Sequence, residues 1–243
     1  MSLYVYAISR AEDGEPPSLN GVLDQPVYRV RSGPLAAIVS PCTQEVVRAE
    51  RKHIAANQRV LSATNAQLDV LPMAFGAIAQ SEADLSAFLD EHADALVAQL
   101  ERIAGAVEMA LKLSLDAPDP IAYLVERAPE LEAARRRVFG RGRTPSYDEK
   151  IRLGQLCDEC LRSYRDALTA QVLALISPSC RDIMVLPVRD ERELAHLAML
   201  VPRAGLGEFQ AAVETSATQF DDDLAFSILG PWPAHNFVGA VLQ

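Results

Sequence analysis

The order of segments in the second half of the chain constrains the fold more than any other feature. Strand-like segments are expected at 107–116, 182–188, 194–202 and 224–230, and helices behind Pro120, behind Ser146 and at 206–220. Asp119 and Pro120 form a helix start, and Ser146 with Glu149 matches a capping box. Strand, helix, strand, strand, helix, strand is the ferredoxin-like order. The sequence therefore predicts an α+β domain of this type.

The first half of the chain is also mixed. Residues 3–9 read as a strand, and residues 27–40 read as two strands around a Ser-Gly-Pro turn. We expect a helix from about Thr43 to Leu68, with Val46, Val47 and Ile54 on its apolar stripe. A strand at 70–79 should be interrupted by proline and glycine, and Ser81 should start a helix that runs to about 103. We predict two α+β domains, at 1–105 and 106–229, and a tail at 230–243.

Charge and composition disfavour several classes of partner. The formal net charge is −10, so we expect no general binding to nucleic acid or to anionic lipid. The longest apolar runs are too short for a membrane span, and no signal peptide is expected behind Met1. Four scattered cysteines are typical of a reducing cytoplasm rather than of a disulfide scaffold.

Cys157 and Cys160 form a CxxC motif, but they lie on the apolar stripe of a predicted helix. A redox CxxC favours a helix N-terminus, and tetrahedral zinc needs four ligands, whereas Cys42 and Cys180 stand alone. We expect core cysteines and no metal or other cofactor.

The histidines also show no catalytic pattern. His92 shares a helical face with leucines, His196 interrupts an apolar strand, and no HExxH, P-loop, GxGxxG or GxSxG occurs. The chain therefore reads as a non-enzyme without catalytic residues. An enzyme whose site is assembled from distant residues, such as His53 or His196 beside a carboxylate, stays open as a rival.

We first interpret two charged clusters as solvent-exposed helix ends. They are the arginines at 135, 136, 137, 141 and 143, and the aspartates at 221–223. The sharper interpretation of the arginines is a docking patch for an acidic surface. The stretch 135–146 is expected to be a loop.

The end of the sequence is unusually apolar for a terminus, and holds the one tryptophan between two prolines. We expect Pro231, Trp232, Pro233 and Phe237 to anchor a tail that clamps the two domains, with contributions from Val238, Val241 and Leu242. The competing interpretation is a tail that extends into solvent and binds a partner protein.

The tail "LGPWPAHNFV" resembles the C-terminal Gly-Pro-Trp-Pro-Pro-Tyr-Ser-Phe-Val signature of the gas vesicle GvpF/GvpL family, with Ala234, His235 and Asn236 in place of Pro-Tyr-Ser. "VLPMAFGAI" resembles the family's Leu-Pro-x-Arg-Phe-Gly segment, with Ala74 in place of Arg. The matching positions there are Leu71, Pro72, Phe75 and Gly76.

The resemblance implies a gas vesicle accessory protein with two α+β domains, which binds the hydrophobic shell protein GvpA and assists assembly or nucleation of the vesicle. It also implies other gas vesicle accessory proteins as partners, and a place in the cytoplasm or as a minor vesicle component. We expect the segment with Leu71, Pro72, Phe75 and Gly76 to bind the partner by β-augmentation. The alternative is a ligand-binding regulatory module with a ferredoxin-like domain.

Overall fold

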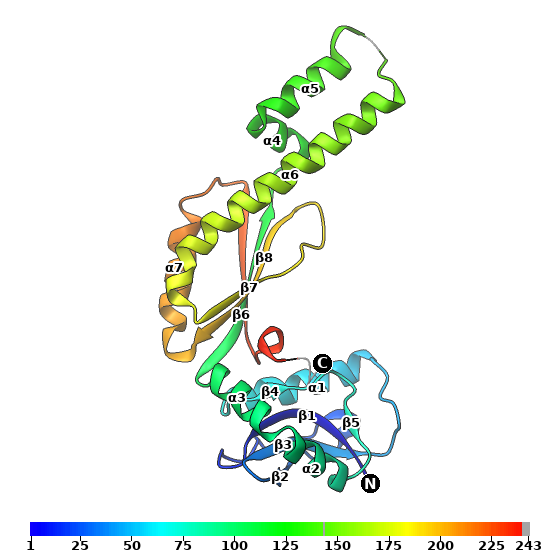
Figure 1. Ribbon diagram of the computed structural model, residues 1–243, viewed down its shortest axis with the longest axis vertical. Coiled ribbons are helices and arrows are strands. Elements are labelled where there is room, and N and C mark those ends of the chain that lie inside the picture. Colours follow the sequence, from blue (N-terminus) through cyan, green and yellow to red (C-terminus); the bar gives the residue numbers. More distant parts are fainter. Residues whose placement is uncertain (143, 240–243) are drawn as a thin grey trace. The chain divides into compact units, whose positions relative to one another are not determined.

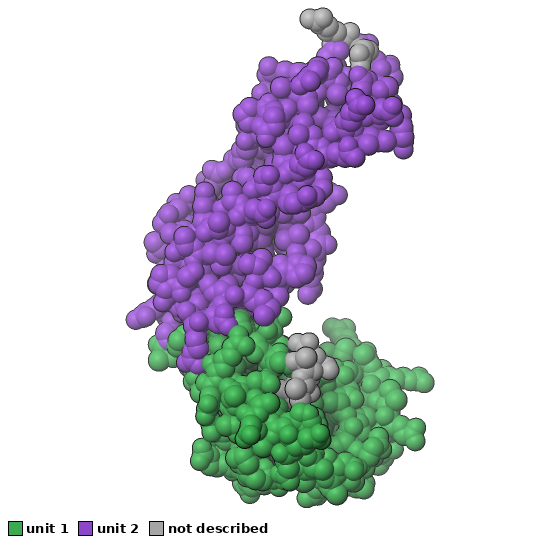
Figure 2. Space-filling view, viewed as in Figure 1, with its two compact units in different colours: residues 1–109, 200–204, 230–243 green, residues 110–199, 205–229 purple. Residues whose placement is uncertain are grey.

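The computed structural model describes residues 1–142 and 144–239, and these fall into two compact units. Unit 1 comprises 1–109, 200–204 and the described part of 230–243, and unit 2 comprises 110–199 and 205–229 (Figure 2). The expected boundary at 105/106 differs from this grouping. Residues 106–109, 200–204 and the tail group with the first unit, so unit 1 is built from three separate stretches of chain.

Unit 1 contains a sheet of five strands in the order β2-β3-β1-β4, with β5 also paired to β1 (Figure 1). The pairs β1/β3, β2/β3, β1/β4 and β1/β5 are antiparallel. The strands are β1 (Ser2–Arg10), β2 (Tyr28–Ser32), β3 (Leu35–Cys42), β4 (Leu71–Pro72) and β5 (Ile78–Ala79), and the helices are α1 (Arg51–Asn65), α2 (Glu82–Glu91) and α3 (Ala93–Ile103).

The core of unit 1 joins the sheet to α1. Tyr4 and Tyr6 of β1 are buried with Val60 and Leu61 of α1 in one apolar cluster. The Tyr6 hydroxyl lies 2.8 Å from the Ser40 hydroxyl oxygen and 2.7 Å from the Val22 backbone nitrogen, which donates to it, so this buried polar group is satisfied.

Two helix predictions in unit 1 are wrong in detail. Helix α1 begins at Arg51 rather than near Thr43, and Val46 and Ile54 are exposed instead of joining the buried stripe. Adjacent β-branched valines disfavour a helix before Arg51, although Val47 still reaches the core from the extended chain. The helix expected to run to residue 103 breaks at His92 into α2 and α3, whereas its predicted start at Ser81 is confirmed: the Ser81 hydroxyl accepts from the Asp84 N–H.

Unit 2 contains a sheet in the order β7-β8-β6-β9, so β8 lies between β6 and β7. The predicted order of strands and helices is confirmed. The strands are β6 (Ala106–Leu115), β7 (Asp182–Val185), β8 (Glu193–Pro202) and β9 (Leu224–Trp232), and the helices are α4 (Pro120–Arg127), α5 (Pro129–Phe139), α6 (Tyr147–Ile176) and α7 (Leu206–Ala217). Helices α6 and α7 lie side by side along the sheet (Figure 1).

The helix starts in unit 2 follow the sequence signals. Asp119 accepts hydrogen bonds from the backbone N–H groups of Ile121 and Ala122, and Ser146 with Glu149 forms a complete capping box. The stretch 135–146 is predicted to be a loop, but α5 includes its first five residues and ends at Phe139, and the i,i+4 pair of Glu132 and Arg136 lies within this helix. Among the described residues, no helix combines the length and apolarity needed to cross a bilayer.

Candidate functional site

The segment expected to bind a partner lies at the edge of the unit 1 sheet. Leu71 is 0 % exposed and Pro72 is buried, and both pair with β1 opposite Ile8 and Ala7. Their side chains are buried in the core and are not accessible at the surface. Between β4 and β5 the chain turns outward, and Ala74 is exposed in this turn.

The outward turn, residues 73–77, is held to β1 by backbone and side-chain contacts. The Met73 N–H donates to the Tyr6 carbonyl at 2.8 Å, and the Val5 N–H donates to the Ala77 carbonyl at 2.9 Å. The Gly76 N–H donates to the Tyr4 hydroxyl at 3.0 Å, and the Phe75 ring meets the Tyr4 ring edge to face at 6.2 Å. Burial raises the pKa of Tyr4 to about 12, although the Gly76 N–H acts in the opposite direction. The hydroxyl therefore stays protonated at neutral pH.

This arrangement makes Phe75 the aromatic residue of the segment that stays accessible. Its ring is half-buried and rests on the core cluster without belonging to it. Partly exposed aromatic side chains on a fixed backbone are common anchors of protein interfaces. Of the four residues expected in the site, Phe75 and Gly76 lie on the turn, whereas Leu71 and Pro72 are buried in β4, which precedes the turn.

The described part of the tail lies in unit 1, and its burial is uneven. Phe237 is 2 % exposed, and Pro233, Ala234 and Val238 are buried, whereas Trp232 is 38 % exposed and Pro231 is also exposed. The tail is therefore embedded through its later residues more than through its tryptophan. Val241 and Leu242, which were expected to contribute, lie outside the described residues.

A buried carboxylate that the sequence reasoning missed binds the tail. Glu108 in β6 is 3 % exposed, and both of its oxygens accept hydrogen bonds from Asn236: one from the backbone N–H at 2.7 Å and one from the side-chain amide at 2.6 Å. Burial raises the pKa of Glu108, and the two Asn236 donors lower it in part. The signal in the sequence was an acid inside an apolar strand, because such an acid needs a partner when it is buried.

Two further contacts fix the tail within unit 1. The Gly239 N–H donates to the Gln99 side-chain oxygen of α3 at 2.7 Å. Gly230 has φ +125°, and a Cβ there would lie 2.9 Å from both the Glu108 carbonyl oxygen and the Met109 sulfur. Only glycine therefore allows the end of β9 to approach β6 this closely.

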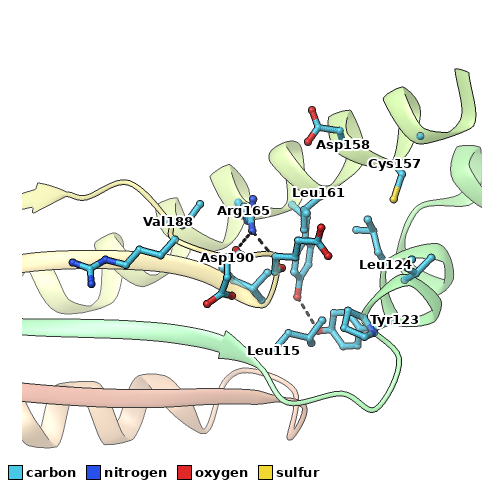
Figure 3. A pocket seen from close by; sticks show the side chains of 16 residues that line it. Leu115, Tyr123, Leu124, Cys157, Asp158, Leu161, Arg165, Val188 and Asp190 are labelled. Carbon is cyan, nitrogen blue, oxygen red and sulfur yellow. Dashed lines mark hydrogen bonds between the residues drawn. The ribbon is translucent and has the colours of Figure 1, made fainter. Parts of the chain in front are cut away.

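Unit 2 contains a pocket of about 480 Å³ between α4, α6 and the segment that precedes β8 (Figure 3). Arg165 of α6 donates to the carbonyl oxygens of Asp190 and Glu191, while its buried Nε has no partner among the described residues. The hydroxyls of Tyr123 and Tyr164 lie 2.8 Å apart. The remaining wall is mostly apolar, as in many small-molecule sites.

The described cysteines and histidines form no cluster suited to a metal ion, although buried His196 lies beside a carboxylate, with its Nδ1 3.7 Å from a Glu193 carboxylate oxygen. Cys160 is buried, Cys157 is half-buried, both are free thiols, and burial raises the pKa of each, which keeps them protonated and unreactive. His92 stacks on Phe88 with ring centroids 4.6 Å apart, and burial lowers the pKa of His196. Within 1–142 and 144–239, no group of three or more His, Cys, Asp or Glu residues could hold a metal ion.

The aspartates at 221–223 are solvent-exposed as predicted, but they lie beyond the end of the helix and Asp221 has partners. Helix α7 ends at Ala217, and the Asp221 carboxylate lies 2.5 Å from an Arg127 nitrogen and accepts from the Tyr123 hydroxyl at 3.2 Å. Arg127 also lies over the Tyr123 ring. Among the arginines, Arg136 pairs with Glu132, and Arg143 lies outside the described residues.

Two compact α+β units, each with its own sheet, and a tail embedded in the first of them define the class as a two-unit α+β protein. The family model described as gas vesicle synthesis protein GvpL/GvpF matches residues 2–239, and the chain belongs to this family.

Individual relatives agree with this assignment. Gas vesicle protein F of Streptomyces sp. (strain CB03234) is 29 % identical over 243 residues, which covers 98 % of this chain and all of that protein. The crystal structure of GvpF from Anabaena sp. PCC7120 has a TM-score of 0.85 at 22 % identity, with 97 % of each chain covered. The crystal structure of GvpF from Microcystis aeruginosa has a TM-score of 0.81 at 19 % identity, with 97 % of this chain and 98 % of that one covered. These two structures share the fold.

Proposed function

We propose that this chain is a non-enzymatic accessory protein which binds the gas vesicle shell protein GvpA in the cytoplasm and assists its assembly into vesicles. The observation that carries the proposal is the match to the GvpL/GvpF family over residues 2–239. A shell subunit with an apolar face aggregates before assembly, and an acidic protein of net charge −10 would keep a complex with it in solution.

We assign the contact to the outward turn of unit 1, with Phe75 as its anchor. The turn combines a half-buried aromatic ring with the exposed residue Ala74. Its backbone is held in place by hydrogen bonds to β1. Because β4 and β5 have two residues each, a long added strand finds little regular edge there. We therefore expect side-chain contacts with Phe75 to contribute more than backbone pairing does.

The test is a pull-down of GvpA from the same genome with the full-length chain. Phe75→Asp should abolish capture, because a carboxylate replaces the apolar anchor, while the melting temperature should fall by only a few degrees. Glu12→Gln, in another loop of unit 1, is the matched surface control and should capture normally. Undiminished capture by folded Phe75→Asp would remove the turn from the interface, and no capture by the unmodified chain would remove GvpA as a partner.

The pocket in unit 2 favours a second candidate function, a ligand-binding regulatory module. Its volume of about 480 Å³ and the unpartnered Arg165 Nε suit a small molecule with a carbonyl or carboxylate group. A rise in melting temperature with such metabolites, absent with GvpA, would support this candidate over the accessory role.

A further inference from the structure

Helices α4, α5 and the first half of α6 surround an apolar groove of about 320 Å³, which borders the unit 2 pocket and shares Ile121, Gly154 and Cys157 with it. We call it the hairpin groove. Ile121 and Phe139 line it and are 61 % and 54 % exposed, so two large apolar side chains are accessible in the same groove. The hairpin groove is lined by Ile121, Val125, Leu131, Arg135, Phe139, Lys150, Leu153, Gly154 and Cys157.

Gly154 lies in the groove and within the 30-residue helix α6. Glycine inside a helix is unfavourable relative to alanine, so it usually has a packing reason. Here a Cβ at Gly154 would meet no atom within 4 Å. The packing of unit 2 therefore does not require glycine at this position, which leaves an open notch in the groove wall.

The charges beside the groove are positive. Arg135 and Lys150 both line it, and neither has an ion pair within the described part of the chain. Two other arginines of the same helices form ion pairs: Arg136 with Glu132 in α5, and Arg162 with Asp158 in α6. Two unpaired cations beside an apolar groove, in a protein of net charge −10, are suited to an acidic partner.

We propose that the hairpin groove binds an amphipathic helix of another protein, one whose apolar stripe is flanked by Asp or Glu. Its apolar side chains would contact Ile121 and Phe139, its backbone would approach α6 over Gly154, and its carboxylates would pair with Arg135 and Lys150. A helix is the favoured occupant because the walls of the groove are helices, and a small residue in a helix wall allows a second helix to come close. This surface is on unit 2, and it does not depend on the contact assigned to GvpA.

The first experiment uses a labelled 18-residue helical peptide with leucines at i, i+3, i+4 and i+7 spacing and flanking glutamates, titrated with the full-length protein by fluorescence anisotropy. Gly154→Ala should weaken binding at least tenfold because its methyl group fills the notch. The same change should raise the melting temperature by roughly 2–4 °C, because alanine favours the helix. Gly207→Ala is the matched control: it also meets no atom within 4 Å, but it lies in α7, and it should leave peptide affinity unchanged.

The second experiment exchanges the charges. The double variant Arg135→Glu, Lys150→Glu should lose the glutamate peptide and gain an otherwise identical peptide flanked by lysines. Equal binding of both peptides to the unmodified protein, or unchanged affinity in Gly154→Ala, would overturn the proposal. Self-association of the protein that Gly154→Ala abolishes would also overturn it, because the occupant would then be a second copy of this chain.

Discussion

At the scale of single residues, the tail shows that composition does not tell which aromatic side chain is buried. Trp232 has the larger side chain and sits between prolines, yet Phe237 is the buried one, because the hydrogen bonds of Asn236 and Gly239 draw the later residues into unit 1. The partner of a buried acid is equally hard to foresee. Glu108 and Asn236 are far apart in the sequence, and only the fold brings them together.

Phe237 should therefore stabilise unit 1 more than Trp232 does. We expect Phe237→Ala to lower the free energy of unfolding by about 3–5 kcal/mol and Trp232→Ala by roughly 1–2 kcal/mol. Urea unfolding followed by circular dichroism measures both. A loss for Trp232→Ala as large as that for Phe237→Ala would contradict the burial, as would emission from Trp232 that iodide cannot quench.

Glu108 should make stability depend on pH. Because its pKa is raised in the folded state, the native protein binds this proton more tightly than the unfolded chain does. The contribution of Glu108 is thus fully present below the unfolded value of about 4.5 and is lost as pH rises through the raised pKa, by at most about 1.4 kcal/mol per pH unit. The free energy of unfolding of the unmodified protein minus that of Glu108→Gln, measured between pH 4 and 8, should fall and then level off. A difference that rises with pH would mean that the carboxylate is favoured by folding.

At the scale of secondary structure, capping residues predicted where three helices begin. Features without such a local signal were not predicted. The caps at Ser81, Asp119 and Ser146 could be found because a cap involves residues two or three positions apart. The break at His92 separates α2, which packs on β2, from α3, which packs on β1, and the apolar pattern of the sequence runs through it without interruption. In the same way, the segment with Leu71, Pro72, Phe75 and Gly76 could be located from its motif, but which of these residues face solvent could not.

The CxxC motif in α6 gives a test at this scale. We expect Cys160→Ala to cost about 1–2 kcal/mol of unfolding free energy and Cys157→Ala less, because the first is buried and the second is half-buried. The purified protein should contain no zinc by elemental analysis, and the double variant should still capture GvpA. One zinc per chain, lost in the double variant, would show that the thiols are ligands.

At the scale of the whole molecule, unit 1 is discontinuous in sequence, which a reading of consecutive segments could not predict. Strand β6 begins in unit 1 and continues into unit 2, and the tail returns to Glu108 and Gln99. We expect a fragment of residues 1–109 to lack a cooperative thermal transition, because the contacts from 200–204 and from the tail are missing. Adding a peptide of residues 228–239 should restore part of the transition by calorimetry, and a sharp transition of the fragment alone would contradict this expectation.

The discontinuity of unit 1 also sets an order of events during translation. At about 5–20 residues per second, the ribosome needs roughly 7 to 26 s to advance from Met109 to Gly239. Until Asn236 is synthesised, the nascent chain contains the β6 residue Glu108 without the two hydrogen bonds that Asn236 donates to its carboxylate. Unit 2 has all of its residues once Leu229 is made, so it can finish folding before unit 1, although unit 1 is made first. A nascent chain arrested before Asn236 would therefore leave this carboxylate without its partner.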